Sequence, residues 1–199
     1  MPNVKKKIPE RGFKFLRCIL APVFKFWYTP KVYGAENIPK DGPILITANH
    51  KHVMDQCSII VSTKRVIHYM AKKEYFDGKL AWFFTMAGCI SVNRSIHDDV
   101  AKEAALDVLK DGGAIGLFPE GTRNKTDAFM LPFKFGAVSM AQKTDAYLVP
   151  VGISGDYKFR SKNLTIRIGK PIDPMDDLDE ANKKLRTTML ELYKENVGK

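Results

Sequence analysis

PILITAN, residues 43–49, is a short and almost wholly apolar run that a polar segment follows directly. Such a run predicts a buried strand. Working outward, similar runs at 65–71, 89–92, 114–118, 146–153 and 163–168 also predict strands. Stretches with helical patterns alternate with them, at 55–64, 79–87, 97–113, 134–144 and 178–196. This alternation predicts an α/β domain with a mostly parallel central sheet covered by helices on both faces.

The length and composition fit one such domain. The chain has 199 residues, of which 45% are hydrophobic and 27% charged. Those values exclude disorder as a description of the whole chain. We find no internal repeat and no second globular domain, so the predicted division is an N-terminal segment at 1–30 and the α/β domain at 31–199.

The net charge of +10 is concentrated near the N-terminus. Residues 1–40 hold nine Lys or Arg and two Glu, whereas the remaining residues hold 23 basic and 20 acidic side chains. A basic terminal segment is attracted to anionic surfaces, either nucleic acid or lipid. Composition alone does not choose between the two.

Residues 13–28 (FKFLRCILAPVFKFWY) are apolar and aromatic, but cations and a proline interrupt them. A spanning helix needs about 20 apolar residues. A secretory signal needs an uninterrupted apolar core and a cleavage site after small residues. Neither is predicted, and Pro22 is expected to kink or split any helix here.

On a helix, this segment becomes amphipathic, with Lys14, Arg17 and Lys25 on the polar half. The apolar half holds Phe13, Phe15, Leu16, Ile19, Leu20, Val23, Phe24, Phe26 and Trp27. That pattern predicts a helix lying on a membrane surface, with Lys5, Lys6 and Lys7 adding attraction to anionic lipid. The alternative is that the apolar stripe packs on the protein's own core, and both could hold for different parts of it.

The three cysteines, Cys18, Cys57 and Cys89, are odd in number and widely spaced. We expect them to be reduced, as in a cytoplasmic compartment, and no metal site is predicted. A catalytic thiol is the less favoured alternative, since no base lies beside any of them in sequence.

The loop after the first strand, NHKHVMD (residues 49–55), contains the candidate catalytic pair His50 and Asp55. A histidine beside a carboxylate can act as a general base near neutral pH. Five positions along a continuous helix are about 140° apart, so the pair meets only if His50 lies in the turn and Asp55 in the first helical turn. His52 is a competing base, whereas His68 falls within a predicted strand.

A second loop, FPEGTR (residues 118–123), follows the strand at 114–118. Gly121 permits a tight turn, including a left-handed one. Backbone N–H groups, the Thr122 hydroxyl and the Arg123 guanidinium would then suit a phosphate. Arg94, after the strand at 89–92, should lie on the same sheet edge and could complete the site, and Lys134 is a weaker candidate.

Four blocks in this order, Asn49-His50 with Asp55, GCISVNR (88–94), FPEGTR and Val149-Pro150-Val151, resemble the 1-acyl-sn-glycerol-3-phosphate acyltransferase family (PlsC-like). The resemblance covers roughly residues 32–172. It implies a lysophosphatidic acid acyltransferase in which His50 is the general base and Asp55 orients it. Residues Arg94, Glu120, Gly121, Thr122 and Arg123 would form the acceptor phosphate site, with Glu120 holding the loop or a basic side chain.

The same resemblance implies acyl-CoA or acyl-carrier protein as the acyl donor and no cofactor. The expected partners are lysophosphatidic acid and an anionic lipid surface, with no nucleic acid. We expect a peripheral or monotopic enzyme on the cytoplasmic face of a membrane, without a full transmembrane span. The fourth block, Val149-Pro150-Val151, would be an apolar strand that either lies near the path of the acyl donor or simply forms part of the core. Another lysolipid acceptor, or a non-enzymatic anionic-lipid or nucleic-acid binder, are the alternative functions.

Overall fold

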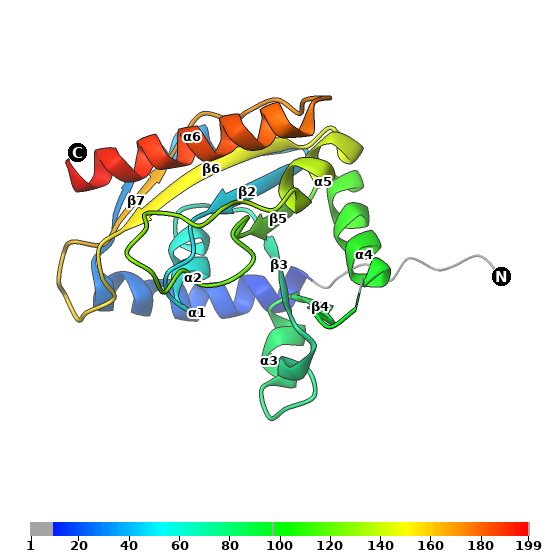
Figure 1. The fold of residues 1–199 in the computed structure, drawn as a ribbon. Helices are drawn as coiled ribbons and strands as arrows, with labels where there is room; N and C mark the ends of the chain where they lie inside the picture. Colours follow the sequence, from blue (N-terminus) through cyan, green and yellow to red (C-terminus); the bar gives the residue numbers. More distant parts are fainter. Residues whose placement is uncertain (1–9, 97, 199) are drawn as a thin grey trace.

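The computed structural model describes residues 10–96 and 98–198 and contains a seven-stranded sheet in the order β1-β7-β6-β2-β5-β3-β4 (Figure 1). The strands are β1 (Lys31–Tyr33), β2 (Ile44–Ala48), β3 (Ile67–Lys72), β4 (Ile90–Val92), β5 (Ala114–Leu117), β6 (Tyr147–Ser154) and β7 (Thr165–Ile168). All neighbouring pairs are parallel except β6 and β7, which are antiparallel. The prediction of a mostly parallel α/β sheet is therefore confirmed.

Side chains of the central strands alternate between two cores, as the two-residue period of a strand requires. Leu45, Ile115 and Leu148 point to the face covered by α4 (Asp99–Lys110), α5 (Gly136–Thr144) and α6 (Leu178–Val197). Ile46 and Val149 point to the opposite face, which α1 (Glu10–Tyr28) and α2 (Asp55–Ile60) cover. Both faces of the sheet are thus buried, which explains the almost unbroken apolar runs of these strands.

The N-terminal helix α1 divides its apolar side chains between the core and the solvent. Phe13 and Phe24 are buried in the core on the α2 side of the sheet. The large apolar side chains of α1 that remain exposed are Phe15, Ile19, Leu20, Val23, Phe26 and Trp27. Packing on the protein therefore accounts for only part of the predicted stripe. The expected role of Lys5, Lys6 and Lys7 lies outside the described residues.

Pro22 does not split α1, which runs as one helix across it. Of the two expected effects, a kink or a split, the split does not occur. Proline removes the N–H that would bond the Cys18 carbonyl. Both residues are exposed, so water can replace that bond.

A few elements differ from the predicted ranges. The helix expected at 55–64 ends at Ile60, where the chain turns through Val61 and Ser62. The edge strand β1 was not predicted, because three alternating residues give too short a pattern. Two further short helices, η1 (Ala35–Asn37) and η2 (Lys73–Tyr75), join the strands, and α3 (Ala81–Met86) forms part of the connection from β3 to β4. Among the described residues, no helix combines the length and the hydropathy needed to cross a membrane.

Candidate active site

His50 and Asp55 meet at the carboxyl end of β2. His50 lies in the loop that follows the strand, and Asp55 is the first residue of α2. The His50 Nδ1 atom is 2.9 Å from Asp55 Oδ2. The turn geometry required by the sequence argument is therefore present.

Asp55 is 1% exposed, and both oxygens of its carboxylate receive hydrogen bonds. Oδ2 accepts the N–H groups of Lys51 at 2.7 Å and His52 at 2.8 Å, besides the His50 ring. Oδ1 accepts the Tyr157 hydroxyl at 2.6 Å. An ionised carboxylate can only accept, so the His50 proton lies on Nδ1 and the Nε2 lone pair is available as a base.

Tyr157 is a site residue that sequence reasoning missed. Burial, with the nearby Asp55 carboxylate as a second cause, raises the pKa of Tyr157 far above its usual value, so its hydroxyl stays protonated and donates. Its ring stacks on His52 and contacts Phe24 and Tyr28 of α1 edge-on. It follows β6, 102 residues after Asp55. No local pattern links two positions that far apart.

Two further contacts fix the place of His50. Its ring stacks on Phe118, with centroids 4.0 Å apart and an interplanar angle of 14°. The preceding Asn49 is buried and exchanges two hydrogen bonds with the backbone of Ile153 in β6, at 2.9 and 2.7 Å. The end of β2 is thereby held to β6 on one side and to the segment after β5 on the other.

The loop after β5 forms two hydrogen bonds with the backbone of His50. The His50 N–H donates to Glu120 Oε1 at 2.7 Å, and the His50 carbonyl accepts the Asn124 N–H at 2.6 Å. The second oxygen of Glu120 accepts the Leu131 N–H at 2.8 Å. Glu120 therefore holds the loop, through backbone donors. Residues 121–123 lie between Glu120 and Asn124 in the chain, and both of those residues bond the backbone of His50.

Burial raises the pKa of the Glu120 carboxyl. The two N–H donors and the nearby His50 and Lys51 lower it in part. Glu120 is 3% exposed, and both oxygens of its carboxylate accept hydrogen bonds from the protein.

The predicted phosphate-binding residues line this loop. Gly121 has φ +70°, so the expected left-handed turn is confirmed. Thr122 and Arg123 are exposed. The Lys134 side chain crosses Gly121, with Nζ 3.0 Å from the position a Cβ atom would take there. The structure thus brings Lys134 and the FPEGTR loop together.

Arg94 lies on the same edge of the sheet but further away. It follows β4, which is separated from β5 by β3, and its side chain is exposed. Arg94 forms no hydrogen bond or ion pair with the loop at 118–124 among residues 10–96 and 98–198. Its part in a phosphate site stays a prediction.

Two cavities lie near these residues. One of about 170 Å³ runs between Phe118, Gly121, Lys134 and Met140. Another of about 230 Å³ is lined by Asp55, Lys51, Tyr157 and residues at the end of β6. The first borders the FPEGTR loop and is mostly apolar, with the Lys134 ammonium as its charged group.

The other candidates take structural positions. His52 stacks on Tyr157 and accepts the Met54 N–H, and buried His68 donates to the Gly88 carbonyl.

All three cysteines are free, and burial raises the pKa of both Cys57 and Cys89 to about 11, so those two thiols are protonated at neutral pH. Residues 149–151 are buried in β6 as core. Within the described part of the chain, no three His, Cys, Asp or Glu side chains group as metal ligands would.

Replacing Glu120 by Ala removes the acceptor of two backbone N–H groups in a buried place. We expect the free energy of unfolding to fall by about 1–3 kcal/mol, measured by urea denaturation. Lys125→Ala, at an exposed position of the same loop, is the matched control and should change stability by less than about 0.5 kcal/mol. Equal stability of the two variants would show that Glu120 does not hold the loop.

The chain is similar to known proteins in sequence and in fold. The acyltransferase family profile matches residues 29–154. The 1-acyl-sn-glycerol-3-phosphate acyltransferase of Bacillus subtilis is 30% identical over 191 residues, which cover 93% of this chain and 94% of that protein. The enzyme of the same name from Borreliella burgdorferi is 35% identical over 141 residues, covering 69% of this chain and 56% of the relative.

Among solved structures, the 1-acyl-sn-glycerophosphate (LPA) acyltransferase PlsC from Thermotoga maritima superimposes with a TM-score of 0.77. The alignment is 25% identical and covers 94% of this chain and 79% of that one. The profile match spans more than half of the chain, and the Bacillus relative matches nearly all of it. The chain belongs to the 1-acyl-sn-glycerol-3-phosphate acyltransferase family.

Proposed function

We propose that this protein transfers a fatty acyl group from an acyl thioester, acyl-CoA or acyl-carrier protein, to the free hydroxyl of 1-acyl-glycerol-3-phosphate, giving phosphatidic acid. The observation that carries the proposal is the contact of His50 with Asp55, held against the FPEGTR loop. The names of the relatives support lysophosphatidic acid as the acceptor.

In the proposed step, His50 Nε2 takes the proton of the acceptor hydroxyl while the hydroxyl oxygen attacks the thioester carbonyl. Asp55 stabilises the imidazolium that forms, because the two groups share a hydrogen bond at 2.9 Å. The tetrahedral oxyanion then collapses, the C–S bond breaks, and the leaving thiolate receives the proton from Nε2. No covalent enzyme intermediate forms. This fits the protonated state of Cys57 and Cys89.

The acceptor phosphate would lie against residues 121–123, with Lys134 and Arg94 as further cations. Arg123 supplies a planar fork of donors that suits phosphate, and Gly121 lets the backbone approach closely. Glu120 is kept from the phosphate, because both of its oxygens accept N–H groups of the protein. Its negative charge therefore interacts with backbone N–H groups of the protein rather than with the ligand.

The exposed face of α1 would hold the enzyme on the cytoplasmic face of an anionic membrane, where acceptor and product reside. Phe15, Ile19, Val23 and Phe26 are spaced by four, four and three residues, so they share one side of the helix. Phe13 and Phe24 secure the other side to the body. Deleting α1 would open the core, so substitutions on its exposed face are the better test of membrane binding.

Replacing His50 by Ala should lower kcat for acyl transfer to lysophosphatidic acid by about a hundredfold or more, because the general base is lost. The assay follows acyl-CoA and acyl-carrier protein as separate donors. Circular dichroism and vesicle sedimentation should match the unsubstituted protein. Near-normal turnover of the variant would end the proposed mechanism.

Replacing Tyr157 by Phe removes one donor to Asp55 without touching the substrate. We expect kcat to fall by about tenfold with little change in KM, because a hydrogen bond to a charged group is lost. Tyr147→Phe, at the exposed start of β6, is the matched control and should leave kcat unchanged. A change in KM alone would mean that Tyr157 contacts substrate instead of positioning Asp55.

The acceptor phosphate is tested with Arg123→Ala and two acceptors, lysophosphatidic acid and its phosphate-free 1-acylglycerol counterpart. We expect KM for lysophosphatidic acid to rise by about tenfold or more, since a charge-assisted contact is lost. The low activity on the phosphate-free acceptor should stay the same. Arg186→Ala, exposed on α6, is the control. Equal use of the two acceptors by the unsubstituted protein would favour another hydroxylated amphiphile as substrate.

A further inference from the structure

The connection from β3 to β4 contains an apolar protrusion, defined here as residues 73–87, that the protein body does not bury. It includes η2 and α3, and none of the α3 residues is buried although its sequence is AWFFTM. Leu80 and Trp82 are 57% and 61% exposed, and Tyr75 is also exposed. A helix in water normally buries its apolar side. A contiguous apolar patch of this kind marks an interaction surface.

The aromatic rings of the protrusion pack mainly on one another. Tyr75 and Phe76 both contact Phe84, with centroids 4.9 and 5.9 Å apart. Phe83 contacts Phe84 at 5.5 Å and Trp82 at 6.0 Å. This internal packing gives the protrusion a defined shape, while Leu80 and Trp82 remain exposed to solvent.

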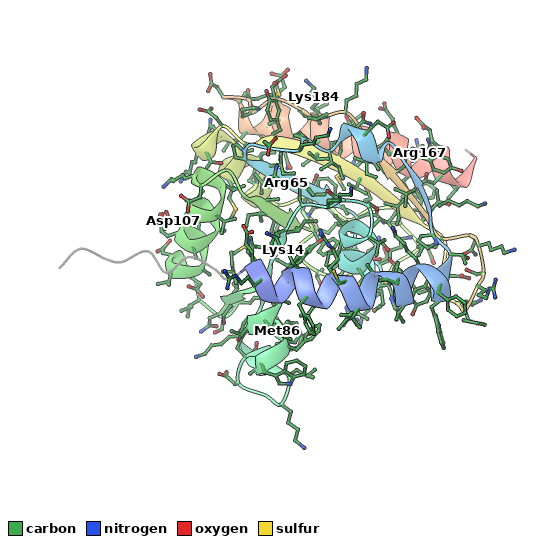
Figure 2. All side chains as sticks on the ribbon, turned by 180° about the vertical axis from the view of Figure 1, so that it is seen from behind. Lys14, Arg65, Met86, Asp107, Arg167 and Lys184 are labelled. Carbon is green, nitrogen blue, oxygen red and sulfur yellow. The ribbon has the colours of Figure 1, made fainter. Side chains whose placement is uncertain are left out.

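The protrusion is fixed next to α1. Both views of the molecule place α3 beyond the body, below α1 (Figures 1 and 2), and Figure 2 labels Met86 in α3 and Lys14 on α1. A Cβ atom on Gly12 would lie 2.4 Å from the Met86 carbonyl oxygen and 2.5 Å from Met86 Cγ. The two helices therefore touch through a position that only glycine fills. The exposed apolar side chains of α1 and of the protrusion are therefore carried by two helices in direct contact.

The charges near the protrusion suit an anionic surface. Lys72, Lys73 and Lys79 are exposed there, against two exposed carboxylates, Glu74 and Asp77. Exposed Arg11 and Lys25 add positive charge along α1, whereas Lys14 pairs with Glu10 and Arg17 donates to the carbonyls of Lys64 and Arg65. Tryptophan and tyrosine flanked by lysine are typical of segments that settle at a bilayer interface.

We propose that the protrusion is a second membrane-inserting element, which enters an anionic bilayer together with the exposed face of α1. This inference rests on the proposed function, because it places an enzyme with bilayer substrates on its substrate surface. The protrusion leaves the sheet at the carboxyl end of β3, the same edge that carries His50 and the FPEGTR loop. Insertion of both α1 and the protrusion, instead of α1 alone, would set the orientation of that edge toward the bilayer.

The two tryptophans of the chain allow each element to be tested alone, because Trp27 lies in α1 and Trp82 in α3. Trp27→Phe leaves Trp82 as the reporter, and Trp82→Phe leaves Trp27. Each full-length variant is mixed with phosphatidylcholine vesicles, with and without phosphatidylglycerol, and with brominated acyl chains as quencher. We expect a blue shift and bromine quenching of Trp82 as well as of Trp27, both stronger with phosphatidylglycerol.

A binding measurement supports the spectra. Leu80→Asp should lower vesicle affinity by at least tenfold, because a charge replaces an inserted side chain. Val197→Asp, exposed at the end of α6, is the matched control and should leave affinity unchanged. Equal affinities of the two variants would overturn the inference.

Other outcomes separate the two proposals. If Trp27 shifts and Trp82 does not, the protrusion does not insert, and the α1 proposal stands. If Trp82 shifts only as protein concentration rises, without vesicles or bromine quenching, a second copy of the chain covers the protrusion and the inference fails. Acyl transfer to detergent-dispersed acceptor is measured in parallel. Insertion without any transfer would leave this inference standing and remove the proposed function.

Discussion

The buried Asp55 carboxylate is the interaction on which the site depends. Its two oxygens accept four hydrogen bonds, from the His50 ring, the Lys51 and His52 N–H groups and the Tyr157 hydroxyl. A buried negative charge without such partners would be strongly unfavourable. The turn after β2 therefore closes around the carboxylate, and the closure sets both the tautomer and the direction of His50.

A second carboxylate organises the neighbouring loop in the same way. Glu120 accepts the N–H groups of His50 and Leu131, and Asn124 bonds the His50 carbonyl from the other side. Residue 50 is thus held through its ring, its N–H and its carbonyl. Tyr157 links the carboxylate of Asp55 to α1, because its ring also contacts Phe24 and Tyr28. The helix with the exposed apolar face and the candidate base therefore share one packed neighbour.

Local patterns predicted most of the fold. The apolar runs at 43–49 and 114–118 became β2 and β5, and the helical pattern at 178–196 became α6. The departures have local causes too. The strand β1 is too short to give a pattern, and α1 continues through Pro22 because that residue faces solvent. Neither departure moves the site, which lies at the ends of the central strands.

The sequence by itself determined the order of the elements, the mostly parallel sheet and the placement of His50, Asp55 and the FPEGTR loop at strand ends. These follow from periodicity and turn residues, which act over a few positions. Only the tertiary structure decided that Tyr157 binds Asp55, that Glu120 grips His50, and that α1 buries Phe13 and Phe24 while leaving Phe15 and Phe26 exposed. The hydrogen bonds of Tyr157 and Glu120 join residues 102 and 70 positions apart, and packing between sheet, loops and helices sets their register.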